Sequence, residues 1–246
     1  MVTLTLNRAK QFNALSQAMI AALQGHLEAV SADAAVRVVV IAGAGKAFCA
    51  GHDLKEMRAN HDKAFMQDLF RRCGKMMMTL TQMPQPVIAR VHGIATAAGC
   101  QLVSMCDLAV AVDSARFATS GINVGLFCAT PGVGLSRNLG RKQALEMLLT
   151  GDFIDAQTAL QQGLVNRVVA SDALDVEVEQ LARSIIAKSS VAIGMGKQMF
   201  YKQLEMGFEA AYQYASEVMA CNMMTADAGE GIDAFIGKRA PVWTGR

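Results

Sequence analysis

The sequence predicts an α/β fold with an all-helical C-terminal part. Short apolar runs with strand character alternate with helical patterns up to residue 170, whereas only helical periodicity is found from residue 171 onward. A chain of 246 residues is long enough for one large α/β domain or for one such domain with a helical appendage. We therefore expect an α/β core over residues 1–170 and a helical region over 171–246 that packs on it.

The first half of the chain alternates strands and helices. A strand is predicted over residues 2–6 from alternating side chains, and strands over 38–41 and 108–112 from continuous apolar runs. A β-branched run predicts a short buried strand over 87–91, and a further short strand is expected over 164–169. Helical spacing predicts helices over 15–30 and 53–83. Ser16 and Asp53 are placed to cap them, because short oxygen-bearing side chains accept bonds from free first-turn N–H groups.

The second half is increasingly helical. Residues 120–127 lack strong periodicity and are expected to form a loop, and Thr130 leads into a helix around 144–149 that Gly151 closes. A short helix over 156–162 ends at Gly163. Helical spacing then predicts helices over 174–186, 191–204, 208–224 and 226–236.

Two junctions between a strand and a helix carry the chemical signal. In the first, the 87–91 strand ends near Gly93 and is followed by five small residues, 95–99, before an apolar helix begins. The first N–H groups of a helix have no partner inside it and attract negative charge. Tight packing of helix on sheet would account for the same small residues.

The second junction favours a binding role. The 38–41 strand runs into a glycine-punctuated loop, 43–51, and then into a helix capped by Asp53. Two such junctions can aim two backbone donors at one carbonyl oxygen, an arrangement that stabilises an enolate or a tetrahedral oxyanion.

Composition limits the partners. The 23 basic and 21 acidic residues give a net charge of +2, which offers no reason to invoke nucleic acid or a membrane surface. The six cysteines form no CxxC pair, which favours a reducing compartment, and no metal-ligand spacing is found. No secretory signal or spanning apolar run is seen, so we expect a soluble cytoplasmic protein.

The sequence resembles the crotonase superfamily, also called the enoyl-CoA hydratase/isomerase family. The likeness lies in FCAGHDLK at 48–55 and HGIATAAGCQ at 92–101. Shorter matching motifs, in family order and spacing, are LNR at 6–8, NAL at 13–15, CD at 106–107, TPG at 130–132, LTGD at 149–152, GLV at 163–165, EGIDAF at 230–235 and KR at 238–239. Together they cover nearly the whole chain.

This resemblance implies a spiral of β-β-α turns that binds an acyl-CoA thioester, with no cofactor besides the coenzyme A of the substrate. His52 and Ala98 match the residues whose backbone N–H groups form the family's oxyanion hole. The helical tail would pack against neighbouring subunits in a homotrimer or a hexamer (a dimer of trimers). The positions matched to substrate binding are Arg8, Lys10, Ala50, Asp53, Leu54, Lys55, Ser120, Asn123 and Lys238; for the basic ones an ordinary surface role is the alternative.

The resemblance also reveals a departure. Family hydratases use two glutamates to activate water, and their positions here hold Gln101 and Gly121. Neither side chain can accept a proton as a carboxylate does, so efficient hydration is not expected. The imidazole of His52 is one alternative for proton transfer, but the resemblance places only its backbone.

The leading interpretation is an acyl-CoA-processing protein that polarises the thioester carbonyl. A non-catalytic acyl-CoA binder is the alternative from another class, and an isomerase or a carbon–carbon lyase of the same family is the third.

Overall fold

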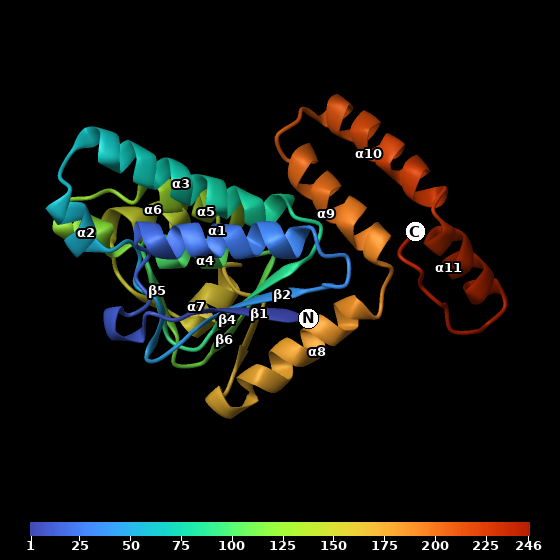
Figure 1. The fold of residues 1–246 in the computed structure, drawn as a ribbon, viewed down its shortest axis with the longest axis horizontal. Helices are drawn as coiled ribbons and strands as arrows, with labels where there is room; N and C mark the ends of the chain where they lie inside the picture. Colours follow the sequence, from blue (N-terminus) through green and yellow to red (C-terminus); the bar gives the residue numbers. More distant parts are fainter.

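The computed structural model describes residues 1–246 and contains two β-sheets (Figure 1). The larger sheet is parallel, with strand order β1-β2-β4-β6-β9. Its strands are β1 (Val2–Leu6), β2 (Val39–Gly43), β4 (Val87–Val91), β6 (Leu108–Val112) and β9 (Arg167–Val169). The smaller sheet has the order β3-β5-β7-β8, in which only β8 is antiparallel to its neighbour. Its strands are β3 (Ala47–Cys49), β5 (Ile94–Thr96), β7 (Arg116–Ala118) and β8 (Ile154–Asp155).

The chain visits the two sheets in turn, which confirms the predicted spiral. Each of β2, β4 and β6 is followed by a short strand of the smaller sheet, and helices follow these pairs. The helices of this part are α1 (Gln17–Ser31), α2 (Leu54–Ala59), α3 (Lys63–Gln82), α4 (Ala98–Met105), α5 (Ala129–Asn138), α6 (Arg141–Thr150) and α7 (Ala156–Gln161), with 3₁₀ turns η1 (Ala9–Gln11), η2 (Ser120–Val124) and η3 (Ser171–Ala173). Because β3 and β5 pair in parallel within the smaller sheet, their carboxyl ends lie next to each other.

Both predicted helix caps are confirmed, but one predicted helix is divided. Ser16 accepts from the N–H of Met19, and Asp53 accepts from the first-turn N–H groups of α2. The helix expected over 53–83 is interrupted at 60–62, where Asp62 caps α3 by accepting from Phe65 N–H. The cap offers those N–H groups a partner and so starts a new helix in the middle of an otherwise helical pattern.

Two other elements differ from expectation. The stretch before the 144–149 helix forms a helix of its own, α5, which packs on α4. Pro131 lies in its first turn, where a proline without an N–H is tolerated. Residues 120–124 form the 3₁₀ turn η2 instead of an irregular loop.

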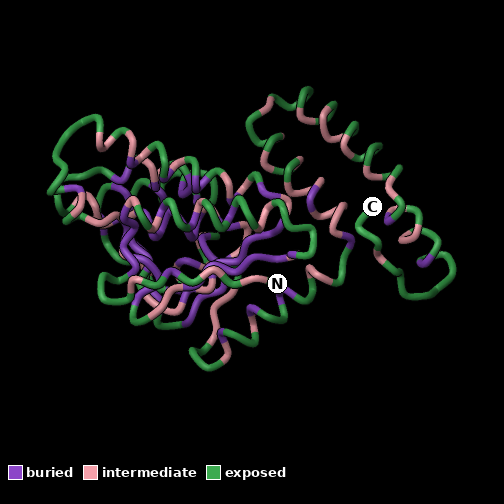
Figure 2. The backbone as a smooth tube through the Cα atoms, in the orientation of Figure 1, coloured by how far each residue is buried: buried purple, intermediate pink, exposed green.

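The C-terminal helices fall into two groups. Helix α8 (Leu174–Ile186) packs against β4 and β6 and buries Leu174, Val178 and Ala182. Helices α9 (Ser190–Gln203), α10 (Phe208–Met223) and α11 (Ala226–Ile236) extend away from the sheets (Figure 1). Figure 2 shows that burial is concentrated around the sheets, whereas α10 has no buried residue. The division at residue 170 stays a prediction; α8 itself covers the sheet.

A buried ion pair ties this helical part to the sheet. Lys197 on α9 donates to Asp107 Oδ2 at 2.6 Å, and Tyr201 donates to Oδ1 at 2.8 Å. The same carboxylate accepts from the N–H of Val87 at the start of β4. Asp107 therefore has a structural role. None of the helices combines the length and the apolar character that a membrane crossing requires.

Candidate active site

The two glycine-rich junctions meet at one point of the structure. Gly51 has φ +94°, and a Cβ placed on it would lie 2.8 Å from Ala97 Cβ and 3.3 Å from Ala98 N. Gly99, in the first turn of α4, lies against β3 so closely that an added Cβ would meet the carbonyl oxygen of Cys49 at 2.0 Å. The residues flanking Gly51 and Gly99 are thereby held in direct contact, which only glycine permits.

Two backbone N–H groups at this contact have no hydrogen-bond partner. The neighbours of His52 are paired, since Leu15 N–H donates to Gly51 O at 2.7 Å and Asp53 N–H donates to Leu15 O at 3.2 Å, but His52 N–H is not. Ala98 is the first residue of α4, and its cap residue, Ala97, has no side-chain acceptor to offer. Two donors on adjoining loops are therefore available to a ligand.

The backbone before Ala98 is strained. Ala97 has φ 50° and ψ −121°, a conformation that L-residues avoid and that costs roughly 1–2 kcal/mol. Its N–H donates to Ala118 O at 3.0 Å and its carbonyl accepts from Gln101 N–H at 3.0 Å, so both ends of the residue are fixed. This turn directs the start of α4 toward Gly51.

A cavity of about 260 Å³ opens at this contact. It is mostly apolar, and its wall comes from α2, α3, the start of α4 and the segment from η2 into α5. The lining residues are Ala50, His52, Leu54, Met57, Phe70, Ala97, Ala98, Ser120, Gly121, Val124, Leu126, Phe127, Cys128, Ala129, Thr130 and Pro131. An apolar cavity with a few polar groups is typical of a small-molecule site.

Six of the thirteen predicted site residues line this cavity: Ala50, His52, Leu54, Ala98, Ser120 and Gly121. The other seven do not: Arg8, Lys10, Asp53, Lys55, Gln101, Asn123 and Lys238. Lys10, Lys55 and Lys238 are exposed on the surface, and Lys238 follows α11 in the helical part.

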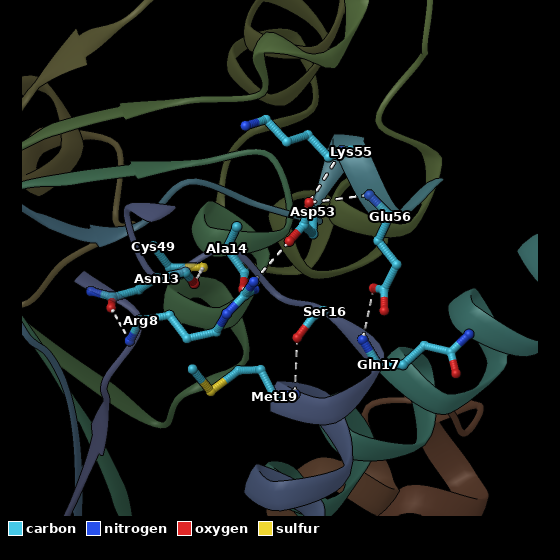
Figure 3. Close-up of polar contacts among 10 residues, drawn as sticks. All are labelled: Arg8, Asn13, Ala14, Ser16, Gln17, Met19, Cys49, Asp53, Lys55 and Glu56. Atoms are coloured by element: carbon cyan, nitrogen blue, oxygen red, sulfur yellow. Dashed lines mark hydrogen bonds and ion pairs between the residues drawn. The ribbon is translucent and has the colours of Figure 1, made fainter. Parts of the chain in front are cut away.

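Arg8 and Asp53 form an ion pair with each other. Arg8 Nη2 lies 2.9 Å from Asp53 Oδ2, and Arg8 Nη1 donates to Ala14 O at 2.7 Å (Figure 3). The hydrogen bond from Arg8 holds the pKa of Asp53 below its usual range. Because Asp53 also caps α2, this pair fixes the loop that carries His52 to the N-terminal segment.

The two positions matched to catalytic glutamates lie in different surroundings. Gln101 is only 4% exposed, and its Oε1 is buried without a hydrogen-bond partner. Gly121 does line the cavity, but a Cβ there would meet Leu126 O at 2.7 Å and Cys128 Sγ at 2.8 Å. The Cys128 thiol and the Leu126 carbonyl thus occupy the space that a side chain at 121 would need.

The polar side chains in the cavity wall are few. Ser120 and Thr96 share a hydrogen bond between their hydroxyls at 2.7 Å. Burial raises the pKa of the Cys128 thiol. The His52 ring packs edge-on against Phe70 at 5.4 Å between centroids, and its Nε2 is buried without a partner. Burial lowers the pKa of His52 from 6.5 to about 4.

Sequence reasoning missed most of the apolar wall. Met57 and Phe70 follow helical spacing, which does not distinguish a cavity wall from an ordinary core position. One feature of the sequence could have indicated part of this wall. Val124, Leu126 and Phe127 are apolar, yet they lie in a segment without strong periodicity.

Comparison with known proteins agrees with this fold. The family model described as enoyl-CoA hydratase/isomerase matches residues 1–246. A Xenopus laevis protein named enoyl-CoA hydratase domain-containing protein 3, mitochondrial, is 47% identical over 97% of this chain and 81% of its own length. The chain therefore belongs to the enoyl-CoA hydratase/isomerase family, the crotonase superfamily.

Solved structures show the same relationship. A Mycobacterium smegmatis structure described as an enoyl-CoA hydratase superposes with a TM-score of 0.97 at 60% identity, covering 98% of this chain and 95% of that one. Human enoyl coenzyme A hydratase domain-containing protein 3 superposes with a TM-score of 0.95 at 45% identity, covering 98% and 96%.

Proposed function

We propose that the protein binds an acyl-CoA thioester and polarises its carbonyl through the N–H groups of His52 and Ala98. The observation that supports this most is the pair of unpartnered donors on adjoining loops at the wall of one apolar cavity. Each donor in such a pair typically stabilises a developing oxyanion by roughly 3 kcal/mol. The positive end of the α4 dipole adds to this, because Ala98 begins that helix.

The carbonyl stretching frequency of a bound thioester tests this proposal directly. We expect infrared difference spectra of 1-¹³C-labelled butyryl-CoA to show a lower carbonyl frequency in the complex than in water. Two strong hydrogen bonds weaken the carbonyl double bond, which lowers its frequency. Tight binding with an unshifted carbonyl would contradict the oxyanion hole, and no binding of any acyl-CoA would contradict the ligand class.

Coenzyme A enters only as part of the substrate in this proposal, and no other cofactor is invoked. Its phosphates would be met by exposed lysines outside the cavity: Lys10 and Lys55 from this chain, and Lys238 from a neighbouring subunit. Arg8, which also pairs with Asp53, would add a further basic side chain near these phosphates.

A non-catalytic acyl-CoA binder is the second candidate function, favoured by a specific feature of the cavity. None of its lining residues is a carboxylate, so no side chain there can hold and deprotonate water as a glutamate pair does. Loss of enoyl absorbance from crotonyl-CoA measures hydration directly. We expect very slow hydration. Turnover by isomerisation or by carbon–carbon cleavage of the enolate would show that the protein is an enzyme. Binding of acyl-CoA without any turnover would favour the binder.

We further propose self-association through α10 and α11, as a homotrimer or a hexamer. Phe208, Met224 and Phe235 are each at least 84% exposed, and they lie on the part of the chain that extends from the sheets. Burying such apolar surface against a second copy is favourable by about 25 cal/mol per Å². Light scattering after size exclusion should give three or six chains; Phe208→Glu should lower that number, whereas Val176→Glu on α8 should not.

The cytoplasmic location also stays a proposal. All six cysteines are free, as a reducing compartment favours. The vertebrate relatives carry the word mitochondrial in their names, so cell fractionation has to compare both compartments.

A further inference from the structure

The acid–base groups of the cavity reduce to two side chains. Among its lining residues only His52 and Cys128 titrate, and Ser120 and Thr130 provide hydroxyls. The wall elements around His52 contribute apolar residues, namely Leu54 and Met57 from α2 and Phe70 from α3. Only these side chains can therefore exchange a proton with a bound thioester.

The imidazole of His52 is in the state that a proton acceptor needs. Burial keeps the ring neutral at neutral pH, so one ring nitrogen carries a free lone pair. Its Nε2 is buried without a hydrogen-bond partner, whereas Nδ1 is neither buried nor hydrogen-bonded, so Nδ1 is the ring nitrogen that a ligand can reach. The edge-on contact with Phe70 limits rotation of the ring. A functional group kept unpaired in a cavity wall is suited to a partner supplied by the ligand.

Cys128 is a poorer candidate for the same task. Burial raises the pKa of its thiol, which therefore stays protonated at neutral pH. A protonated thiol cannot accept a further proton, and a thiolate would form only at alkaline pH.

We propose that the His52 imidazole takes and returns the α-proton of the bound acyl-CoA thioester. This inference rests on the proposed oxyanion hole. An imidazole nitrogen lone pair removes the proton from Cα, the C–H electron pair becomes the C=C bond of the enolate, and the carbonyl π pair moves to oxygen. The reverse steps return a proton from the imidazolium to Cα, so atoms and charge balance without any co-reactant.

The charges formed in this step stabilise each other. An imidazolium alone would be costly in an apolar wall, but it forms only together with the enolate oxygen, which is held by the N–H of the same residue and by Ala98. His52 thus contributes its backbone to the oxygen and its side chain to the carbon. Replacing the side chain leaves the N–H in place, so the two roles can be separated.

Exchange of the α-hydrogens of butyryl-CoA for deuterium in D₂O, followed by proton NMR, tests the side-chain role. We expect exchange by the wild type and a fall of about 100-fold or more in His52→Gln, with butyryl-CoA affinity and the carbonyl shift retained. His26→Gln, at an exposed position on α1 outside the cavity, should exchange like the wild type. Undiminished exchange in His52→Gln with the carbonyl shift retained would overturn the proposal, as would a wild type that binds and polarises the thioester without exchange.

Two further measurements keep the test decisive if His52→Gln does not fold. Added imidazole should restore exchange to His52→Ala. In the wild type, the exchange rate should rise as pH increases through the His52 transition and level off by neutral pH; a rise confined to alkaline pH would identify Cys128 instead. Absence of both thioester binding and the carbonyl shift would refute the proposed function as well, which distinguishes the two failures.

Discussion

Replacing Gly51 by alanine tests the contact that brings the two junctions together. The added Cβ would lie 2.8 Å from Ala97 Cβ, 3.2 Å from Thr96 O and 3.3 Å from Ala98 N. These are short contacts to a strand end and to a backbone turn that is itself strained, so no flexible side chain can move aside. The variant must therefore separate the loops or shift the start of α4.

The expected magnitude follows from two costs. Alanine at φ +94° is strained by roughly 1–2 kcal/mol, and forcing an extra methyl into a packed contact typically costs 1–3 kcal/mol. We expect Gly51→Ala to lower the free energy of unfolding by about 2–5 kcal/mol in urea titrations. The carbonyl frequency of bound butyryl-CoA should also move back toward its value in water, because the Ala98 N–H is displaced.

Gly25→Ala is the matched control. Gly25 lies within α1, is exposed, and has no atom within 4 Å of an added Cβ. Alanine there should stabilise the protein by up to about 1 kcal/mol, because it is the better helix former. If Gly51→Ala were as stable as the wild type and kept the full carbonyl shift, the close approach of the loops would not be what positions the donors.

Three further predictions concern other contacts. Gly121→Ala should destabilise the protein by about 1–3 kcal/mol in the same titrations, because its Cβ meets Leu126 O and Cys128 Sγ; equal stability would show that the segment adapts freely. Lys197→Met should cost about 3–5 kcal/mol by leaving Asp107 buried and unpaired, and Asp107→Leu combined with Lys197→Met should recover part of it; an additive double variant would argue against coupling. The folded-state pKa of His52, about 4, lies below its unfolded value of 6.5, so stability should be full above pH 6.5 and fall by up to about 3 kcal/mol as pH drops toward 4. His52→Gln should reduce that loss, and an unchanged pH dependence would contradict a buried neutral imidazole.

Local patterns predicted the elements well where one signal dominated. The helices over 174–186 and 226–236 and the strand over 108–112 have the expected bounds, because hydrophobic period and helix or strand length agree there. The interruption of the helix at residues 60–62 was not predicted, because Asp62 is recognisable in the sequence as a possible cap but does not by itself show that the chain turns there. The helix over 129–138 was missed because its glycines and Pro131 are poor helix formers that packing on α4 overrides.

For the site, the amino-acid sequence by itself determined which residues flank the two junctions. Glycines at 51 and 99 and small residues at 95–98 are local choices that allow a close approach of backbones, and the family motifs mark His52 and Ala98. Only the tertiary structure decided that Gly51 lies against Ala97 and Ala98, that Arg8 is paired with Asp53, and that Gln101 lies outside the cavity wall. Parallel pairing of β3 with β5 brings together two junctions that are far apart in the sequence, and spacing along one chain does not encode which side-chain atoms then meet.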